Sequence, residues 1–191
     1  RGLGDVYKRQ ISLRLAREGV AVGILDLDQA KAAEIASQIT TAGGKATSEH
    51  CDISDYGQIK EAVLKIEGSN GATDILVNNA GTNIRKRPED FSESEWHHVL
   101  DTNLTSAFLC SKACYPEMKR RGGGKILNNG SMTSLFSSPW LTAYGSSKGG
   151  MVQFTRGLAT AWAEDNIQAN CFLPGWIDTD LTRRALSLIH I

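Results

Sequence analysis

An alternation of strand and helix patterns constrains the fold of this chain more than any other feature. A short apolar run ending in acidic residues, over residues 20–28, is typical of a buried strand. Apolar residues at helical spacing then predict a helix over residues 29–42. The alternation continues with further strands predicted at residues 45–51, 74–77, 125–129 and 168–174.

Such an alternation requires parallel strands joined by right-handed helical crossovers. We therefore expect an α/β fold with a Rossmann-like, doubly wound parallel sheet in three α/β/α layers. Long helices are predicted over residues 103–119 and 143–164, and Ser92 and Glu95 have the spacing of a capping box. Ligands of such sheets bind at the carboxyl ends of the strands, so the informative residues should directly follow each strand.

Length and composition are those of one globular domain. The chain has 191 residues and a formal net charge of zero, so charge gives no reason to expect nucleic acid or a membrane surface as partner. No apolar stretch is long enough to span a bilayer. The four cysteines form no CxxC pair, and we expect reduced, mostly buried thiols in a cytoplasmic protein.

The two ends resemble translated adapter sequence. Residues 5–10, DVYKRQ, can be encoded by GATGTGTATAAGAGACAG, and the reverse complement of that string encodes LSLIHI, which is residues 186–191. The string resembles a transposon end used in sequencing libraries. We therefore expect residues 1–10 and 186–191 to be foreign and residues 11–185 to be a single Rossmann-type domain in a metagenomic fragment. Gly2 and Gly4 are accordingly rejected as part of a phosphate-binding loop.

Polar and small residues follow the first three predicted strands. Asp26 can accept hydrogen bonds from the hydroxyls of an adenosine ribose, whereas Asp28 fits a helix N-cap. Asp52 fits either a contact with an adenine amino group or a turn. The motif Asn78-Asn-Ala-Gly81 places small residues where a backbone can approach a flat ring.

Ser131, Tyr144 and Lys148 form the decisive constellation. Tyr144 and Lys148 are four residues apart, on one face of a predicted helix. A nearby cation stabilises a phenolate, which allows the tyrosine to act as an acid or base nearer neutral pH. Ser131 follows a strand and can hold a substrate oxygen beside the phenol.

These motifs together resemble the classical short-chain dehydrogenase/reductase (SDR) family, over nearly all of residues 11–185. The order and spacing of NNAG at residues 78–81, Asn103, Ser131, Tyr144-xxx-Lys148 and PGWIDT at residues 174–179 match that family. Similarity near residues 78–91 is to gluconate and deoxygluconate dehydrogenases, and also to tropinone-reductase-like proteins and 3-oxoacyl-carrier reductases. The family's first strand, its glycine-rich loop and its C-terminal part are missing here, and Gly130 stands where the family often has serine.

The resemblance implies a role for each matching residue. Tyr144 would be the acid/base, Lys148 would bind the nicotinamide ribose, Ser131 would orient the substrate, and Asn103 would hold a relay water. The implied cofactor contacts, besides Tyr144 and Lys148, are Asp26, Asp52, Asn79, Ala80, Gly81, Pro174, Gly175 and Thr179. NAD is expected rather than NADP, because the Asp26 carboxylate would repel a 2′-phosphate.

The implied reaction is NAD(P)-dependent hydride transfer between a secondary alcohol and a ketone, with a sugar acid as one substrate class. Arg85, Lys86 and Arg87 either attract a carboxylate or form a solvated basic loop. The alternatives are a 3-oxoacyl-carrier-protein-type reductase, a non-catalytic nucleotide-binding homologue, and an inactive fragment. The small-molecule substrate is the expected partner, together with a second copy in a homodimer or homotetramer.

Two further pairs of residues were considered for a metal site and for a substrate pocket. His97 and His98 are consecutive and cannot share one helix face, so no metal site is expected. Trp140 and Trp176 flank the candidate catalytic segments and fit either a substrate pocket or ordinary packing.

Overall fold

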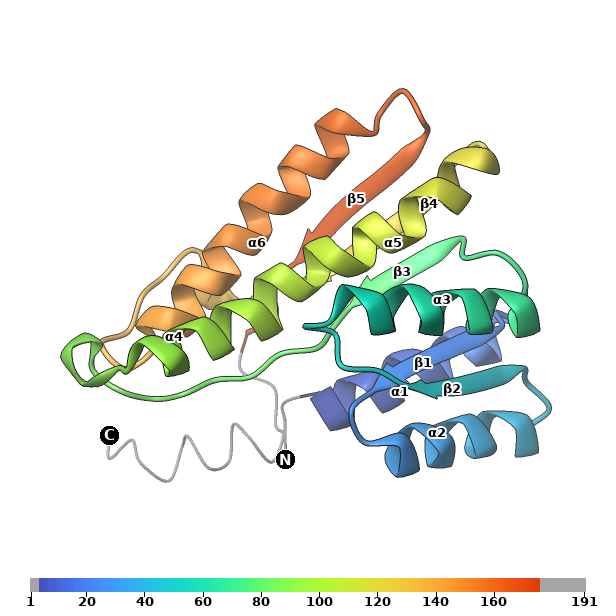
Figure 1. The fold of residues 1–191 in the computed structure, drawn as a ribbon, viewed down its shortest axis with the longest axis horizontal. Helices are drawn as coiled ribbons and strands as arrows, with labels where there is room; N and C mark the ends of the chain where they lie inside the picture. The colour runs from blue at the N-terminus through green and yellow to red at the C-terminus, as the bar shows by residue number, and fades with distance from the viewer. Residues whose placement is uncertain (1–3, 176–191) are drawn as a thin grey trace.

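A computed structural model describes residues 4–175 of the chain, and within this range strands and helices alternate (Figure 1). The α-helices and strands, in chain order, are α1 Gly4–Arg17, β1 Val22–Asp26, α2 Gln29–Thr41, β2 Ala46–His50, α3 Tyr56–Asn70, β3 Ile75–Asn78, α4 Glu93–Leu100, α5 Ser106–Arg120, β4 Gly124–Asn129, α6 Thr142–Ala161 and β5 Ile167–Phe172. Short helical turns, labelled η, lie at η1 Pro88–Asp90, η2 Asp101–Thr105 and η3 Met132–Ser134.

All the pairs of neighbouring strands are parallel, as the alternation predicts. β1 pairs with β2, and β4 lies between β3 and β5. The described strands therefore form two separate sheets, one of two strands and one of three. This confirms the Rossmann-like α/β/α fold.

Each sheet has its own apolar core. The core of the larger sheet is centred on residues with no exposed surface, such as Ile59 of α3, Met118 of α5 and Ile126 of β4. The smaller sheet packs Val22 and Ile24 of β1 against Ala32, Ala36 and Ile39 of α2. Figure 1 shows α3 and α5 crossing in front of the strands. On α6, Leu158 is buried in the larger core, and Phe154 and Trp162 pack against it.

Two sequence signals for the start of a helix are confirmed. Asp28 caps α2 by accepting from the backbone N–H of Lys31, and Ser92 forms a capping box with Glu95 at the start of α4. The predicted helix over residues 103–119 is wrong at its start, because η2 is a turn of π-helix that precedes α5. The helix predicted to end at residue 164 ends at Ala161 instead.

Candidate active site

Tyr144 and Lys148 lie one turn apart on α6, as their spacing predicts. The Nζ atom of Lys148 is 5.7 Å from the centre of the Tyr144 ring. Ser131 directly follows β4 and is the N-cap of η3. Ser134 connects the two segments: its hydroxyl accepts from the backbone N–H of Ser131 at 3.2 Å and donates to the backbone oxygen of Lys148 at 2.7 Å. The structure therefore brings the three predicted catalytic residues to one place.

Lys148 is a buried base, with 3% of its surface exposed. Its ammonium donates a hydrogen bond of 2.6 Å to the backbone oxygen of Asn129, at the carboxyl end of β4. Burial disfavours the charged form and lowers the pKa of Lys148 to about 8. The lysine can therefore change its charge near physiological pH, which a group in a proton-transfer site requires.

Asn103 fixes the loop that follows β3. It is 1% exposed and lies in the π-helical turn η2. Its side chain accepts from the backbone N–H of Thr82 at 2.7 Å and donates to the Thr82 oxygen at 3.0 Å and to Ser147 at 2.9 Å. These contacts engage both ends of the amide, so the relay water implied by the resemblance stays a prediction.

Gly81 allows this loop to approach Lys148 closely. A Cβ atom added at Gly81 would lie 3.4 Å from Oδ1 of Asn103 and 3.7 Å from Nζ of Lys148. The NNAG motif, including Ala80, thus ends beside the predicted catalytic group. A larger side chain at this position would fill space between the loop and the lysine.

Several buried polar atoms around these loops have no hydrogen-bond partner among the described residues. They include Nδ2 of Asn79 and Oδ1 of Asn83 after β3, and Oδ1 of Asn129 and Oγ1 of Thr133 at and beyond the end of β4. Asn79 uses only its oxygen, which accepts from Asn129 at 2.8 Å. Buried polar groups in folded proteins are normally paired. The unpaired atoms gather at the strand ends where a dinucleotide is expected, so the residues present fit a nicotinamide cofactor.

A buried polar network beneath the site was missed by the sequence reasoning. Asn128 has no exposed surface; it accepts from Asn78 at 2.8 Å and donates to Thr155 of α6 at 2.9 Å. Asn78 also donates to Ser111 of α5 at 3.2 Å. The network connects β3, β4, α5 and α6. The sequence signal that could have predicted it is the pair Asn128-Asn129 at the end of β4, a strand with an apolar middle.

The two predicted adenosine-binding acids lie at the ends of the smaller sheet. Asp26 ends β1, and its carboxylate accepts from the backbone N–H of Asp28 at 3.0 Å. Asp52 accepts from the backbone N–H and the hydroxyl of Ser54, and the hydroxyl bond lowers the pKa of Asp52 most. Asp52 thus makes the contacts of a turn residue, which is one of the two roles predicted for it. The cofactor roles of both residues stay predictions.

The segment after β5 is described only in part. The backbone oxygen of Pro174 accepts from Met132 at 2.9 Å, which places Pro174 beside η3, and Gly175 is exposed. Thr179 and Trp176 lie outside the described residues. Gly130 is packed tightly, because an added Cβ would collide with the Leu173 side chain and lie 2.9 Å from Sγ of Cys171. A serine at position 130 would therefore require Leu173 to move.

The three basic residues at positions 85–87 differ in their surroundings. Lys86 pairs with Glu95, and Arg87 pairs with Glu89 and lies over the half-exposed Trp140 ring at 5.9 Å. Arg85 has no ion pair with any described residue. A backbone bridge between Lys86 and Leu141 places this loop beside the segment that leads into Tyr144.

The remaining candidates show no second site in the described part of the chain. Cys51, Cys110 and Cys114 are buried free thiols, as predicted, and burial raises the pKa of Cys110 and Cys114 to about 12. His97 and His98 are exposed, and no three histidine, cysteine or acidic side chains between residues 4 and 175 are grouped as metal ligands. Over the same range, no helix is long and apolar enough to cross a membrane.

Comparison with known proteins shows the family to which the chain belongs. The family model described as short chain dehydrogenase matches residues 1–187. Gluconate 5-dehydrogenase of Gluconobacter oxydans is 34% identical over 174 residues, which are 91% of this chain and 68% of that protein. The 3-oxoacyl-[acyl-carrier-protein] reductase of Chlamydia pneumoniae is 34% identical over 86% of this chain and 66% of its own length. The chain therefore spans about two thirds of the length of these relatives.

Solved structures show the same fold. A gluconate 5-dehydrogenase from Burkholderia cenocepacia, crystallised in complex with NADP and tartrate, superposes with a TM-score of 0.87 at 34% identity. The match covers 93% of this chain and 71% of that one. The family match extends over nearly the whole chain. This chain belongs to the short-chain dehydrogenase family.

Proposed function

We propose that the protein to which this chain belongs is an NAD(P)-dependent oxidoreductase that interconverts a secondary alcohol and a ketone. The observation that carries the proposal is the meeting of Ser131, Tyr144 and the buried Lys148 beside unpaired polar atoms at the carboxyl ends of β3 and β4. A scaffold homologue without activity would not need this arrangement. The family relationship supports the same conclusion.

Each residue has a distinct part in this chemistry. When bound, the cofactor carries the hydride. Tyr144 gives a proton to the ketone oxygen in reduction and removes it from the alcohol in oxidation. Ser131 holds that oxygen beside the phenol, and the positive form of Lys148 favours the phenolate. The backbone oxygen of Asn129 positions the Lys148 ammonium for this role.

A sugar acid is the substrate class that the loop at residues 85–87 favours. Lys86 and Arg87 are already paired with carboxylates, whereas Arg85 has no such partner among the described residues. A guanidinium that is not neutralised suits a substrate carboxylate, which it binds with two parallel hydrogen bonds. The names of the Gluconobacter and Burkholderia relatives, and the tartrate in the latter, support this class.

NAD is the proposed cofactor rather than NADP. The reason is the Asp26 carboxylate at the end of β1, which would repel a 2′-phosphate. The Burkholderia relative was crystallised with NADP, so the cofactor preference of this protein requires its own measurement. We also propose a cytoplasmic location, supported by the buried free thiols, and a homodimer or homotetramer assembled through α5 and α6.

A chimera tests the function. In this chimera, residues 11–185 of the chain are joined to the flanking segments of the Gluconobacter relative. These segments supply the family's first strand, glycine-rich loop and C-terminal part. We expect NAD-dependent oxidation of gluconate, followed by absorbance of the reduced cofactor. The second candidate, favoured by the Chlamydia relative, is reduction of a 3-oxoacyl thioester. Faster turnover of the thioester than of the sugar acid would select that candidate.

A further inference from the structure

Lys148 is hydrogen-bonded to both ends of the segment that carries Ser131. Its ammonium donates to the backbone oxygen of Asn129 at 2.6 Å, and its own backbone oxygen accepts from the hydroxyl of Ser134 at 2.7 Å. Ser131 lies between these two points, after β4 and at the start of η3. Residues 129–134 therefore form a loop that is closed at both ends on one residue of α6. We call these residues the serine loop.

The hydroxyl of Ser134 makes two contacts at once. Its oxygen accepts from the backbone N–H of Ser131 at 3.2 Å, and its proton goes to the backbone oxygen of Lys148. A hydroxyl has a single proton, so the bond to Lys148 leaves only lone pairs to face Ser131. One side chain thus connects the backbone of Ser131 to α6, the helix that also carries Tyr144.

The Ser131 side chain is oriented as a hydrogen-bond donor. Its Oγ atom accepts from the backbone N–H of Thr133 at 3.1 Å, which uses a lone pair and leaves the O–H group to donate. Between residues 4 and 175, no group accepts from this hydroxyl. A donor aimed at a substrate oxygen helps most when negative charge develops on that oxygen. The position of Ser131 therefore matters for the rate of the reaction.

The helix lies directly against the serine loop. A Cβ atom added at Gly145 would lie 3.7 Å from the backbone oxygen of Thr133, and one added at Gly149 would lie 3.8 Å from that of Ser134. These are van der Waals contact distances, and neither residue has a side chain to separate the two backbones. The short side chain of Ser134 can therefore reach the backbone of α6.

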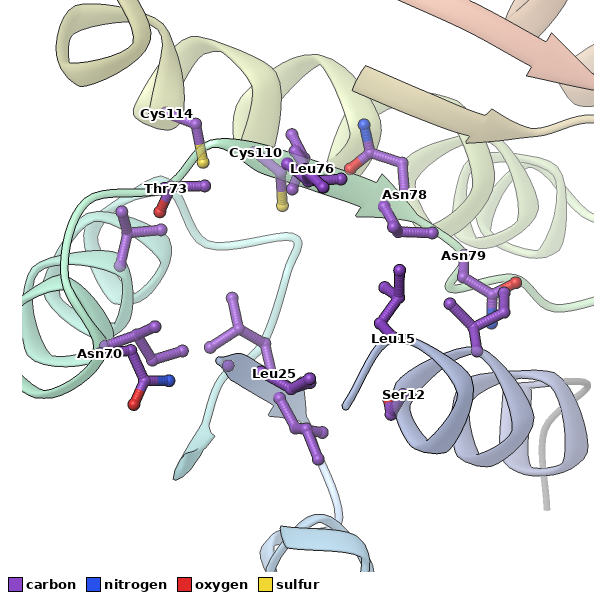
Figure 2. A pocket seen from close by; sticks show the side chains of 18 of the residues that line it. Ser12, Leu15, Leu25, Asn70, Thr73, Leu76, Asn78, Asn79, Cys110 and Cys114 are labelled. Atoms are coloured by element: carbon purple, nitrogen blue, oxygen red, sulfur yellow. The ribbon is translucent and has the colours of Figure 1, made fainter. Parts of the chain in front are cut away.

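The other sides of the loop are held differently. The side chain of Asn129 donates to that of Asn79 at 2.8 Å, and Figure 2 shows Asn79 just beyond the end of β3. Toward β5, backbone N–H groups of the loop donate to the oxygens of Phe172 and Pro174. The connection through Ser134 is thus the contact with α6 that a single side-chain substitution removes without changing Lys148.

We propose that Ser134 is a positioning residue, whose hydroxyl sets the place of the Ser131 donor relative to Tyr144. The proposal rests on the proposed function, because Ser134 acts through Ser131. Loss of the Ser134 hydroxyl releases the backbone of Ser131 from α6 and leaves the bonds toward β5 in place. The donor bond strengthens as the substrate oxygen gains charge, so its displacement lowers kcat more than it raises KM.

Variants of the chimera test this role. Ser134→Ala should lower kcat with the sugar acid about 10- to 100-fold, the scale of a misplaced reacting group, with KM and the Kd of NADH unchanged. Ser134→Thr keeps the hydroxyl at this half-buried position and should retain kcat within about threefold. Ser137→Ala, at an exposed serine of the same connection, is the matched control and should leave kcat unchanged. Ser134→Cys, with similar shape and a weak donor, replaces Ser134→Ala if the latter does not fold.

A double-mutant cycle shows whether Ser134 acts through Ser131. In a chimera that already carries Ser131→Ala, the further change Ser134→Ala should lower kcat less than about twofold, because the donor that it positions is gone. A displaced Tyr144 or a general loss of folded protein would lower kcat in both backgrounds alike. The cycle therefore separates positioning from a structural effect.

Amide hydrogen exchange tests the contact without turnover. In the 191-residue chain, Ser134→Ala removes the acceptor of the Ser131 N–H, so exchange at Ser131 should become at least about tenfold faster than in Ser137→Ala. Exchange at Gly130, whose N–H is bonded to the oxygen of Phe172, should not change.

Several outcomes would overturn the proposal. With an active chimera, these are an unchanged kcat in Ser134→Ala, equal losses in Ser134→Ala and Ser134→Thr, or an equal loss with and without Ser131. An inactive unmutated chimera would contradict the proposed function instead. Exchange at Ser131 then decides on the contact: a faster rate in Ser134→Ala supports it, and an unchanged rate overturns it.

Discussion

The ammonium of Lys148 lies 2.6 Å from the backbone oxygen of Asn129, in a site where only 3% of the lysine surface is exposed. The partner in this bond is a neutral carbonyl group at the end of a central strand. It stabilises the ammonium less than a carboxylate would, and burial lowers the pKa of Lys148 to about 8. The charge of Lys148 is therefore set mainly by its burial.

This pKa predicts a pH-dependent effect of Lys148→Met on stability. Between about pH 8 and 10.5, the unfolded chain holds a proton that the folded chain has released, so this group adds stability as the pH rises. Below pH 8 the folded protein carries a buried charge that methionine removes. The stability advantage of the variant over the wild type should therefore shrink by about 3 kcal/mol between pH 7 and pH 11.

Urea unfolding of both proteins at several pH values checks this. Buried thiols also change the stability at high pH, but they are the same in both proteins and cancel in the difference. Lys45→Met, at an exposed lysine, is the control and should show no such trend. A constant difference between Lys148→Met and the wild type would show that the lysine pKa is not lowered by burial.

Gly130→Ala should destabilise the protein by about 1–3 kcal/mol, the usual cost of overpacking. The added methyl group collides with Leu173, so Leu173→Ala in the same chain should recover part of the loss. Gly157→Ala is the control: nothing lies within 4 Å of an added Cβ there, and alanine favours the helix. Thermal unfolding measures all four proteins. Equal melting temperatures for Gly130→Ala and the wild type would rule out the close packing.

Much of this arrangement is predictable from sequence, because it depends on local patterns. The apolar periodicities locate the strands and most helices, and the four-residue spacing of Tyr144 and Lys148 predicts their shared face. The π-helical turn η2 was missed because a π-turn has no apolar pattern of its own, and Asn103 is held there by Thr82 and Ser147 from distant segments. Long-range contacts of this kind leave no periodic signal.

Cofactor preference tests the role of Asp26. In the chimera, Asp26→Ser should narrow the preference for NAD over NADP, because it removes a charge that repels the 2′-phosphate. Values of kcat/KM with the two cofactors measure the preference. Asp28→Ser is the control, since Asp28 caps α2 and should change stability more than cofactor choice. Equal efficiency with NADP in the unmutated chimera would contradict the assignment.

Arg85→Ala should raise the KM of the chimera for a sugar acid with little change in kcat, because the contact binds ground state and transition state alike. The KM for the sugar acid should rise about 10-fold or more, the scale of a lost hydrogen bond to a charged group. The KM for a neutral secondary alcohol of similar size should not change. Arg87→Ala, at an arginine already paired with Glu89, is the matched control. Equal losses for the acid and the neutral alcohol would exclude recognition of the carboxylate.

The most direct test of the proposed chemistry is the turnover of the chimera with Tyr144→Phe, which removes the hydroxyl and keeps the ring. We expect kcat to fall by at least about 100-fold, the scale of general acid–base catalysis, while NADH fluorescence titration gives an unchanged Kd. A kcat close to that of the unmutated chimera, with the cofactor still bound, would contradict the role of Tyr144 and with it the proposed active site.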